Sequence, residues 1–402
     1  MNPLNSRCGR TVTHATGYAA FVPKPLPPNP PLAFDGEMIR LLSEADLALG
    51  ALSGVASLLP NPDLFVAMYV RKEAVLSSQI EGIQCTLDDV LVQENAEAAG
   101  NGVSSKAIGE VVNYVQAMNH GIARLADLPL SLRLIREIHQ VLLDRVRGTH
   151  KDPGEFRRSQ NWIGPQGCTL TTATFVPPSV PDMETALFDL EKFLHDRTAV
   201  PLTIQCALVH LQFETIHPFL DGNGRVGRLL IALLMHERSV LKQPLLYLSL
   251  YLKRNRVEYY DRLMDVRVNG NWEGWVKFFL RGIAEVSRES AATAKKIVGF
   301  RDTALATARG IGKHEAALTD LLFERPIIDI RAAEKMLGTT YATASQAVAN
   351  LEKAGYLKET TGMKRNKVYR FSGYLDLFDE PEQMGQSTQL MDVTGNASMV
   401  NG

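Results

Sequence analysis

Long apolar runs are missing from this 402-residue sequence. The longest candidate, residues 229–235, is too short to span a bilayer and is followed at once by His236 and Glu237. At the N-terminus, no basic start precedes an apolar core, the pattern that a secretory signal peptide requires. We therefore expect a cytoplasmic protein that does not cross a membrane.

Cysteine is scarce as well, and the charge balance favours neither sign. The four cysteines form no CxxC pair, which argues against a disulfide framework and against a metal knuckle (Cys8, Cys85, Cys168 and Cys206). The formal net charge of −1 gives no whole-protein argument for binding nucleic acid or an anionic membrane. Apolar residues make up 45% of the chain, enough to bury the cores of two or three domains.

Composition and periodicity divide the chain into segments. Residues 1–35 are rich in proline, asparagine and glycine and predict an extended arm. Helical spacing of apolar residues follows, over an N-terminal region, 36–103, and a core, 104–300. Within that core, residues 226–237 are apolar nearly all round and predict a helix buried at the centre. Residues 380–402 are polar and aperiodic and predict a disordered tail.

Two segments break the helical pattern. Residues 161–176 combine β-branched and aromatic residues around Gly-Pro-Gln-Gly and predict a β-hairpin. Residues 311–378 predict helices at 313–323, 330–337 and 341–354, then strands at 356–359 and 367–371. Three helices followed by a hairpin are the layout of a winged helix. We therefore expect a mainly α fold with a hairpin in the core and a C-terminal winged helix-turn-helix domain.

The clearest chemistry lies in residues 217–228, HPFLDGNGRVGR. Closely spaced glycines precede a predicted helix, where backbone N–H groups can converge on a phosphate. Arg225 and Arg228 can face the same side of the first turn, and guanidinium groups match phosphate oxygens. Asp221 is a ligand of the kind that Mg²⁺ takes beside substrate phosphates, and His217 is a candidate general base. Together these features indicate a phosphoryl- or nucleotidyl-transfer site.

This segment resembles the Fic family, whose motif HxFx(D/E)GNGRxxR it matches at every defined position. The resemblance covers roughly residues 40–300 and implies that His217 deprotonates a Ser, Thr or Tyr hydroxyl of a target protein. Asp221 would hold Mg²⁺ against the α- and β-phosphates of ATP. Arg225 would contact the α/β-phosphate region and Arg228 the γ-phosphate. The remaining nucleotide-binding residues would form the anion nest and its surroundings (Gly222, Asn223, Gly224, Val226 and Gly227). Attack at the α-phosphorus would leave AMP on the target and release pyrophosphate.

The resemblance leaves the identity of the transferred group open, because members of the family transfer different groups. Relatives transfer UMP or phosphocholine, and a kinase-like branch carries a bulkier residue and a lysine where this chain has Gly222 and Gly224. The two glycines favour AMP. The alternatives are transfer of UMP or phosphate, and a nucleotide-sensing DNA-binding regulator. The intact His217 and Asp221 argue against the regulator, because a sensor needs no base.

An inhibitory segment is also indicated upstream of the motif. Residues 77–82, SSQIEG, match the family's inhibitory pattern (S/T)xxxE(G/N), with Ser77 and Glu81 at its two defined polar positions. Taken alone, the pattern is also that of an ordinary helix end before glycine. Beside the motif, it implies that the Glu81 carboxylate pairs with Arg228 in place of the γ-phosphate and misaligns ATP. In some relatives this glutamate also aligns a water that removes AMP from the target.

Two further features resemble the family. The predicted hairpin lies where relatives carry a flap that holds the target, and Thr174, Phe175 and Val176 would line it. Tyr259 and Tyr260 fall where relatives use aromatic residues to enclose adenine, although packing in the core is an equal alternative.

The partners that the sequence predicts are ATP, a protein with an exposed hydroxyl and, among further alternatives, a second copy of the chain. The predicted wing carries Lys364, Arg365, Lys367 and Arg370, which suit DNA phosphates. The same unit also contains many acidic residues, so its net charge is only slightly positive. We therefore favour recruitment of a target or a dimer partner over DNA binding for the winged helix.

Overall fold

The computed structural model describes residues 5–57, 62–98, 105–146, 151–165 and 167–379. The predicted tail at 380–402 lies outside these residues. The fold is mainly helical, as expected, with a small sheet at each end of the described chain. None of the described helices is both long enough and apolar enough to cross a membrane.

The N-terminal segment is packed and does not form the predicted extended arm. After the short helix α1 (Asn5–Cys8), strands β1 (Gly9–Thr13) and β2 (Ala19–Pro23) form an antiparallel hairpin. Cys8, Ala20, Phe21 and Leu32 are buried against the core. The prediction was wrong because apolar side chains within a proline-rich stretch find partners that composition alone does not indicate.

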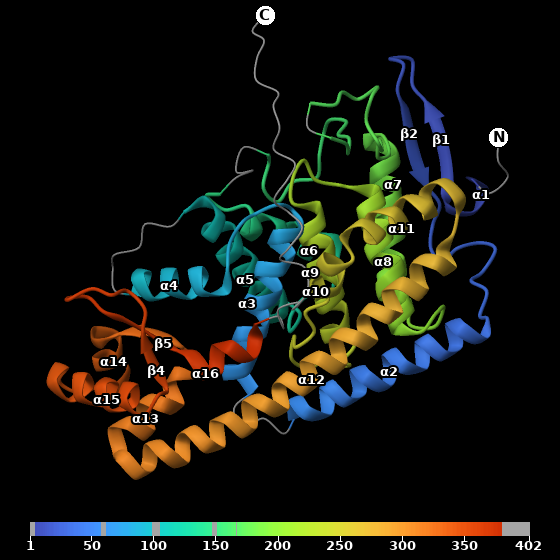
Figure 1. The fold of residues 1–402 in the computed structure, drawn as a ribbon. Helices are drawn as coiled ribbons and strands as arrows, with labels where there is room; N and C mark the ends of the chain where they lie inside the picture. The colour runs from blue at the N-terminus through green and yellow to red at the C-terminus, as the bar shows by residue number, and fades with distance from the viewer. Residues whose placement is uncertain (1–4, 58–61, 99–104, 147–150, 166, 380–402) are drawn as a thin grey trace, which may run out of the picture.

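Two long helices lie side by side along one edge of the molecule, α2 (Gly36–Ser57) and α12 (Trp272–Ile311) (Figure 1). The two helices run in the same direction, because residue numbers rise together along the ion pairs that join them. Lys277 pairs with residues 35 and 37, Arg281 with Glu37, and Arg288 with Glu44. The pair spans the molecule, and α12 connects the helical core to the C-terminal unit (Figure 1).

The helical core is built around two helices that are buried on almost every side, α8 (Leu202–Ile216) and α9 (Asn223–Glu237). Residues 203–216 are all buried, and α9 is buried at most positions, which confirms the predicted central helix. The other core helices pack around this pair and are α3 (Pro62–Ile80), α4 (Leu87–Ala98), α5 (Lys106–Arg124), α6 (Leu132–Leu142), α7 (Val180–His195), α10 (Ser249–Arg254) and α11 (Arg256–Asn269). Serine N-caps at residues 105, 131 and 179 fix where α5, α6 and α7 begin.

The C-terminal unit contains the three expected helices and a three-stranded antiparallel sheet in the order β3-β5-β4. Its elements are α13 (Lys313–Leu322), β3 (Ile327–Asp329), α14 (Ile330–Leu337), α15 (Tyr341–Lys353), β4 (Leu357–Glu359), β5 (Val368–Phe371), α16 (Ser372–Leu375) and a final 3-10 turn, η1 (Asp376–Phe378). Asp329 caps α14, and Gly338, with a φ of 57°, ends it, as the sequence predicted.

Candidate active site

The loop between α8 and α9 presents the motif residues. His217 ends α8 in the left-handed region, with a φ of 49°, and Gly222 precedes α9 with a φ of 78°. A left-handed backbone is unfavourable for histidine and is retained only where surrounding contacts fix it. The His217 carbonyl accepts hydrogen bonds from Arg157 Nε at 3.1 Å and Asn161 Nδ2 at 3.0 Å, which supply that constraint.

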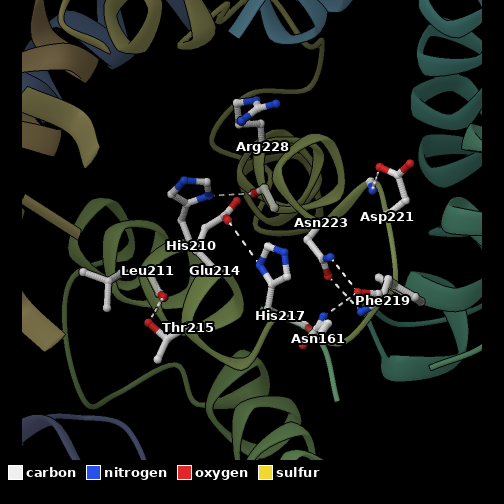
Figure 2. A network of polar contacts seen from close by, with 12 residues as sticks. Asn161, His210, Leu211, Glu214, Thr215, His217, Phe219, Asp221, Asn223 and Arg228 are labelled. Carbon is white, nitrogen blue, oxygen red and sulfur yellow. Dashed lines mark hydrogen bonds and ion pairs between the residues drawn. The ribbon is translucent and has the colours of Figure 1, made fainter. Parts of the chain in front are cut away.

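Asn223 closes this loop and does not point toward a ligand. Its Oδ1 accepts from the Phe219 N–H at 2.9 Å, and its Nδ2 donates to the Phe219 carbonyl at 2.8 Å (Figure 2). The side chain is 2% exposed. The predicted role in an anion nest therefore falls to the backbone of the loop, while the Asn223 side chain holds its shape.

His217 has the surroundings of a neutral base. Burial and, to a smaller extent, the nearby Arg267 guanidinium lower the pKa of its imidazole to about 4. At neutral pH the ring is therefore uncharged and can accept a proton. Its Nδ1 lies 4.0 Å from Glu214 Oε2, and the two side chains face each other in Figure 2. Burial raises the pKa of Glu214 to about 7.

The N-terminus of α9 holds a carboxylate in the position that a phosphate would favour. A Cβ added at Gly224 would lie 2.2 Å from Glu81 Oε1, so only glycine allows this carboxylate to approach the first turn. Unpaired N–H groups and the helix dipole attract an anion at this place. Glu81 thus occupies the anion site that the sequence predicted for the nucleotide.

Arg228 ties the inhibitory segment to the motif. Its Nη2 donates to Glu81 Oε1 at 2.7 Å, and its Nε donates to Ser77 Oγ at 2.8 Å. Arg228 is buried, whereas 32% of the Glu81 side-chain surface is exposed. Burial alone would raise the pKa of Glu81, but the Arg228 guanidinium outweighs it and leaves that pKa below its ordinary value. The structure therefore contains the predicted ion pair of Glu81 with Arg228, and it adds a bond from Arg228 to Ser77 that the sequence did not predict.

Arg225 does not face the nucleotide site as predicted. Its guanidinium is buried and pairs with Glu110 of α5 at 2.9 Å, while Asp221 lies 3.8 Å away. Its neighbours Val226 and Gly227 are also buried in α9. A Cβ at Gly227 would come within 2.9 Å of Glu214 Oε1, so this glycine makes room for the buried carboxyl. In this structure these three residues pack inside the core beside the site.

Asp221 remains available as a metal ligand. About 29% of its side chain is exposed, and its Oδ1 accepts the Gly222 N–H at 2.7 Å. Within the described residues no group of three or more His, Cys, Asp or Glu side chains could hold a metal alone. A single carboxylate that shares Mg²⁺ with substrate phosphates fits this arrangement, since Mg²⁺ is often bound by one or two carboxylates plus phosphates.

The predicted hairpin at 161–176 is reduced to one bridge between Ile163 and Phe175, and its residue 166 lies outside the described part. Phe175 and Val176 are buried. The Arg267 guanidinium carbon lies over the Phe175 ring, 4.0 Å from the ring centre. The Val176 carbonyl accepts the Phe21 N–H of β2 at 2.9 Å. Of the three predicted flap residues, only Thr174 is exposed to a target. The glycine- and threonine-rich stretch favours turns over a regular ladder.

The two tyrosines behave differently. Tyr259 is 1% exposed and bonds through its hydroxyl to His210 at 2.9 Å, so its ring belongs to the core and is closed to adenine in this structure. Tyr260 is 40% exposed and stays a candidate for the adenine side of the site.

Several residues that shape the site carry no local sequence signal. They come from separate elements and meet only in the fold (Glu110, His139, Arg157, Asn161 and Arg267). His139, for example, stacks on Phe219 at 3.7 Å between ring centres and bonds the Asp221 carbonyl at 3.0 Å. A buried histidine or arginine in a helix cannot be assigned to a site before its tertiary neighbours are known.

Comparisons with known proteins find similar sequences over the helical core. The model of the Fic/DOC family N-terminal region matches residues 39–123, and the model of the Fic/DOC family matches residues 129–235. Curated relatives named protein adenylyltransferase Fic are 30% identical over 218 residues in Drosophila yakuba and 31% identical over 219 residues in Aedes aegypti. Both alignments cover 52% of this chain and 39% of the relative, so the chain spans well under half the length of these relatives.

Among solved structures, a Fic family protein from Desulfovibrio desulfuricans G20 aligns with a TM-score of 0.53 and 21% sequence identity. The alignment covers 85% of this chain and 98% of that one. At this level of identity, the likeness shows the fold.

Proposed function

We propose that this chain, whose residues 39–123 and 129–235 match the models of the Fic/DOC family, transfers AMP from ATP to a hydroxyl of a protein, itself included. One observation carries the proposal. A neutral, partly buried His217 and a helix N-terminus suited to an anion lie at the two ends of one hydrogen-bonded loop. The names of the curated relatives support the same activity.

The chemistry follows from this loop. His217 takes the proton of the target hydroxyl as its oxygen forms a bond to the α-phosphorus. The bond from that phosphorus to the bridging oxygen breaks, and pyrophosphate leaves with the electron pair. The α9 N-terminus and Arg228 stabilise the phosphate charge through groups that are already oriented. Asp221 would hold Mg²⁺, which neutralises charge on the phosphates when bound. Gly222 and Gly224 stand where the kinase-like branch carries a bulkier residue and a lysine, which favours this reaction over transfer of a phosphate alone. The names of the curated relatives favour AMP over UMP.

In the same proposal, Glu81 is an inhibitor. Its carboxylate occupies both the α9 N-terminus and Arg228, so ATP meets a negative charge where its γ-phosphate would lie. A nucleotide that binds despite this charge is displaced from in-line geometry, and a displacement of about 1 Å can cost roughly 10²-fold in rate. The exposed part of Glu81 also faces water, which supports a second role in orienting a water that removes AMP.

The test is intact mass of the purified chain after incubation with MgATP, for the wild type, Glu81→Gly and Glu81→Gly with His217→Ala. We expect one added AMP on Glu81→Gly, formed roughly 10²-fold faster than on the wild type. The double variant should show none, because the base is lost. Glu97→Gly, which removes an exposed carboxylate on α4, should behave as the wild type.

If no variant gains AMP, each variant is incubated with labelled ATP and a panel of cell proteins. Label on a cell protein would indicate an external target, and no label would indicate a donor other than ATP. Transfer from UTP but not from ATP would overturn the choice of AMP. Equal transfer by the wild type and Glu81→Gly would overturn the inhibitory role alone.

A further inference from the structure

The C-terminal unit turns one face away from the catalytic core. Helix α15 packs on α13, α14 and β4 of its own unit, whereas α13, α16 and η1 contact α12, and β3 contacts α4. Figure 1 places α14, α15 and the turn between β4 and β5 at the end of the molecule opposite the N-terminal hairpin. Helices α14 and α15 are joined by a short turn, residues 338–340, that begins with Gly338, as in a helix-turn-helix.

Basic side chains gather on this outer face. Lys364, Arg365 and Lys367 are exposed on the turn between β4 and β5, and within the described chain none of the three forms an ion pair. With Arg331 and Tyr341 from the starts of α14 and α15, they line a hollow between the turn and the helices. The Arg331 guanidinium lies 4.6 Å from the centre of the Tyr341 ring.

Most of the acidic residues that bring the net charge of the unit close to zero form hydrogen bonds or ion pairs in the fold. Glu359 accepts the N–H groups of Thr361 and Gly362, and Asp329 caps α14 through Ala332 N. The other acidic residues in defined contacts pair with side chains, and these pairs are Glu334 with Arg331, Asp320 with Arg301, Asp376 with Arg370, and Glu315 with Asn350. On the outer face, Asp329 lines the hollow and Glu359 lies near Lys367, but neither forms an ion pair with the three basic side chains of the turn.

Helix α15 complements the basic turn with neutral polar groups. Its first turns expose Tyr341 and Gln346 and partly expose Thr343, and its first carboxylate is Glu352, near its end. Neutral hydroxyl and amide groups suit the edges of bases in the major groove, which is wide enough for an α-helix. Lysine and arginine on a neighbouring turn suit the phosphates that flank the groove.

We propose that this face binds duplex DNA, with α15 in the major groove and Lys364, Arg365 and Lys367 on the adjacent phosphates. Net charge alone favoured a protein partner, whereas the three exposed basic side chains on one turn beside a neutral polar helix favour DNA. The proposal does not depend on AMP transfer, since the face lies apart from His217 and Arg228.

The test is fluorescence anisotropy of a labelled duplex of roughly 20 base pairs, about two helical turns, titrated with the full chain between about 50 and 200 mM salt. The variant Lys364→Ala, Arg365→Ala and Lys367→Ala should bind at least about tenfold more weakly at the lower salt. Its slope of log affinity against log salt should be shallower by roughly three. A control that also removes three exposed positive charges, Lys242→Ala, Lys295→Ala and Lys296→Ala, should bind as the wild type.

A second variant, Thr343→Glu with Gln346→Glu, keeps the basic turn and adds two carboxylates to the outer face of α15. It should lose binding as well, because the carboxylates meet phosphates and base edges. Wild-type affinity in this variant would overturn the groove placement. Equal weakening by the basic-turn and control variants would overturn the proposal, and so would displacement of the duplex by poly-glutamate at equal charge, which would indicate an acidic protein partner.

Discussion

Helix α9 holds two buried arginines one turn apart, and their carboxylate partners differ in a way that separates support from regulation. Arg225 pairs with Glu110, whose side chain is 5% exposed, and Arg228 pairs with Glu81, whose side chain is 32% exposed. Glu110 comes from the second turn of α5. Glu81 comes from the turn just after α3, where Gly82 has a φ of 83°.

The difference in location decides what each pair can do. Glu110 can leave Arg225 only if α5 moves, so that pair is part of the fold. Glu81 sits at a helix end with few neighbours, and a change in that turn is enough to withdraw its carboxylate. A phosphate can then replace it on Arg228 without disturbing the core. The same chemistry, a carboxylate on a guanidinium, thus serves as a structural contact in one place and as an exchangeable one in the other.

The largest effect expected from this comparison is on stability. Glu110→Ala should lower the free energy of unfolding by about 3–5 kcal/mol, because it leaves the buried Arg225 charge without its partner. Glu81→Ala should cost only about 1 kcal/mol, since water reaches this pair and Arg228 keeps its bonds to Ser77. Urea unfolding of both variants beside the wild type measures the two values. Equal losses would remove the distinction between the pairs.

The pH dependence of inhibition is the next test. The folded pKa of Glu81 is depressed, so its ion pair is present above the ordinary glutamate pKa and is lost only as pH falls through the lower folded value. His217, with a pKa of about 4, stays neutral over the same range. Between about pH 8 and pH 5, the ratio of AMP transfer by Glu81→Gly to that by the wild type should therefore stay constant within about twofold.

Initial rates of AMP incorporation at several pH values measure this ratio. A wild type that becomes as active as Glu81→Gly near pH 6 would mean that another group controls the inhibition. Glu214 would be the first to examine, because burial gives it a pKa of about 7 and it faces His217.

The two arginine pairs also show what the sequence could and could not predict. The pairing of Glu81 with Arg228 was predictable, because both residues lie in short local patterns. The pairing of Glu110 with Arg225 was not, since a glutamate within an amphipathic helix carries no sign of its partner. For the same reason, the sequence assigned Arg225 to the nucleotide and gave no role to His139.

The fold shows the same limit. The helices at 313–323, 330–337 and 341–354 agree with α13, α14 and α15 to within a residue at each end, because caps and periodicity are local signals. The N-terminal hairpin and the short strand β3 were missed. Their stability comes from partners distant in the sequence, such as Phe175 for Phe21 and Tyr369 for Ile328.

The smallest expected effect concerns a third ion pair, which tests whether the C-terminal unit holds the inhibitory segment in place. Arg370 of β5 donates to Asp88 at 2.8 Å, and Asp88 lies in the first turn of α4, shortly after Glu81. Asp88 is 45% exposed, and Arg370 also pairs with Asp376. Asp88→Asn should therefore lower the free energy of unfolding by less than about 1 kcal/mol and leave AMP transfer within about twofold of the wild type. A rise toward the rate of Glu81→Gly would show that β5 restrains Glu81 through α4. Both the turn after α3 and the C-terminal unit would then control the ion pair of Glu81 with Arg228.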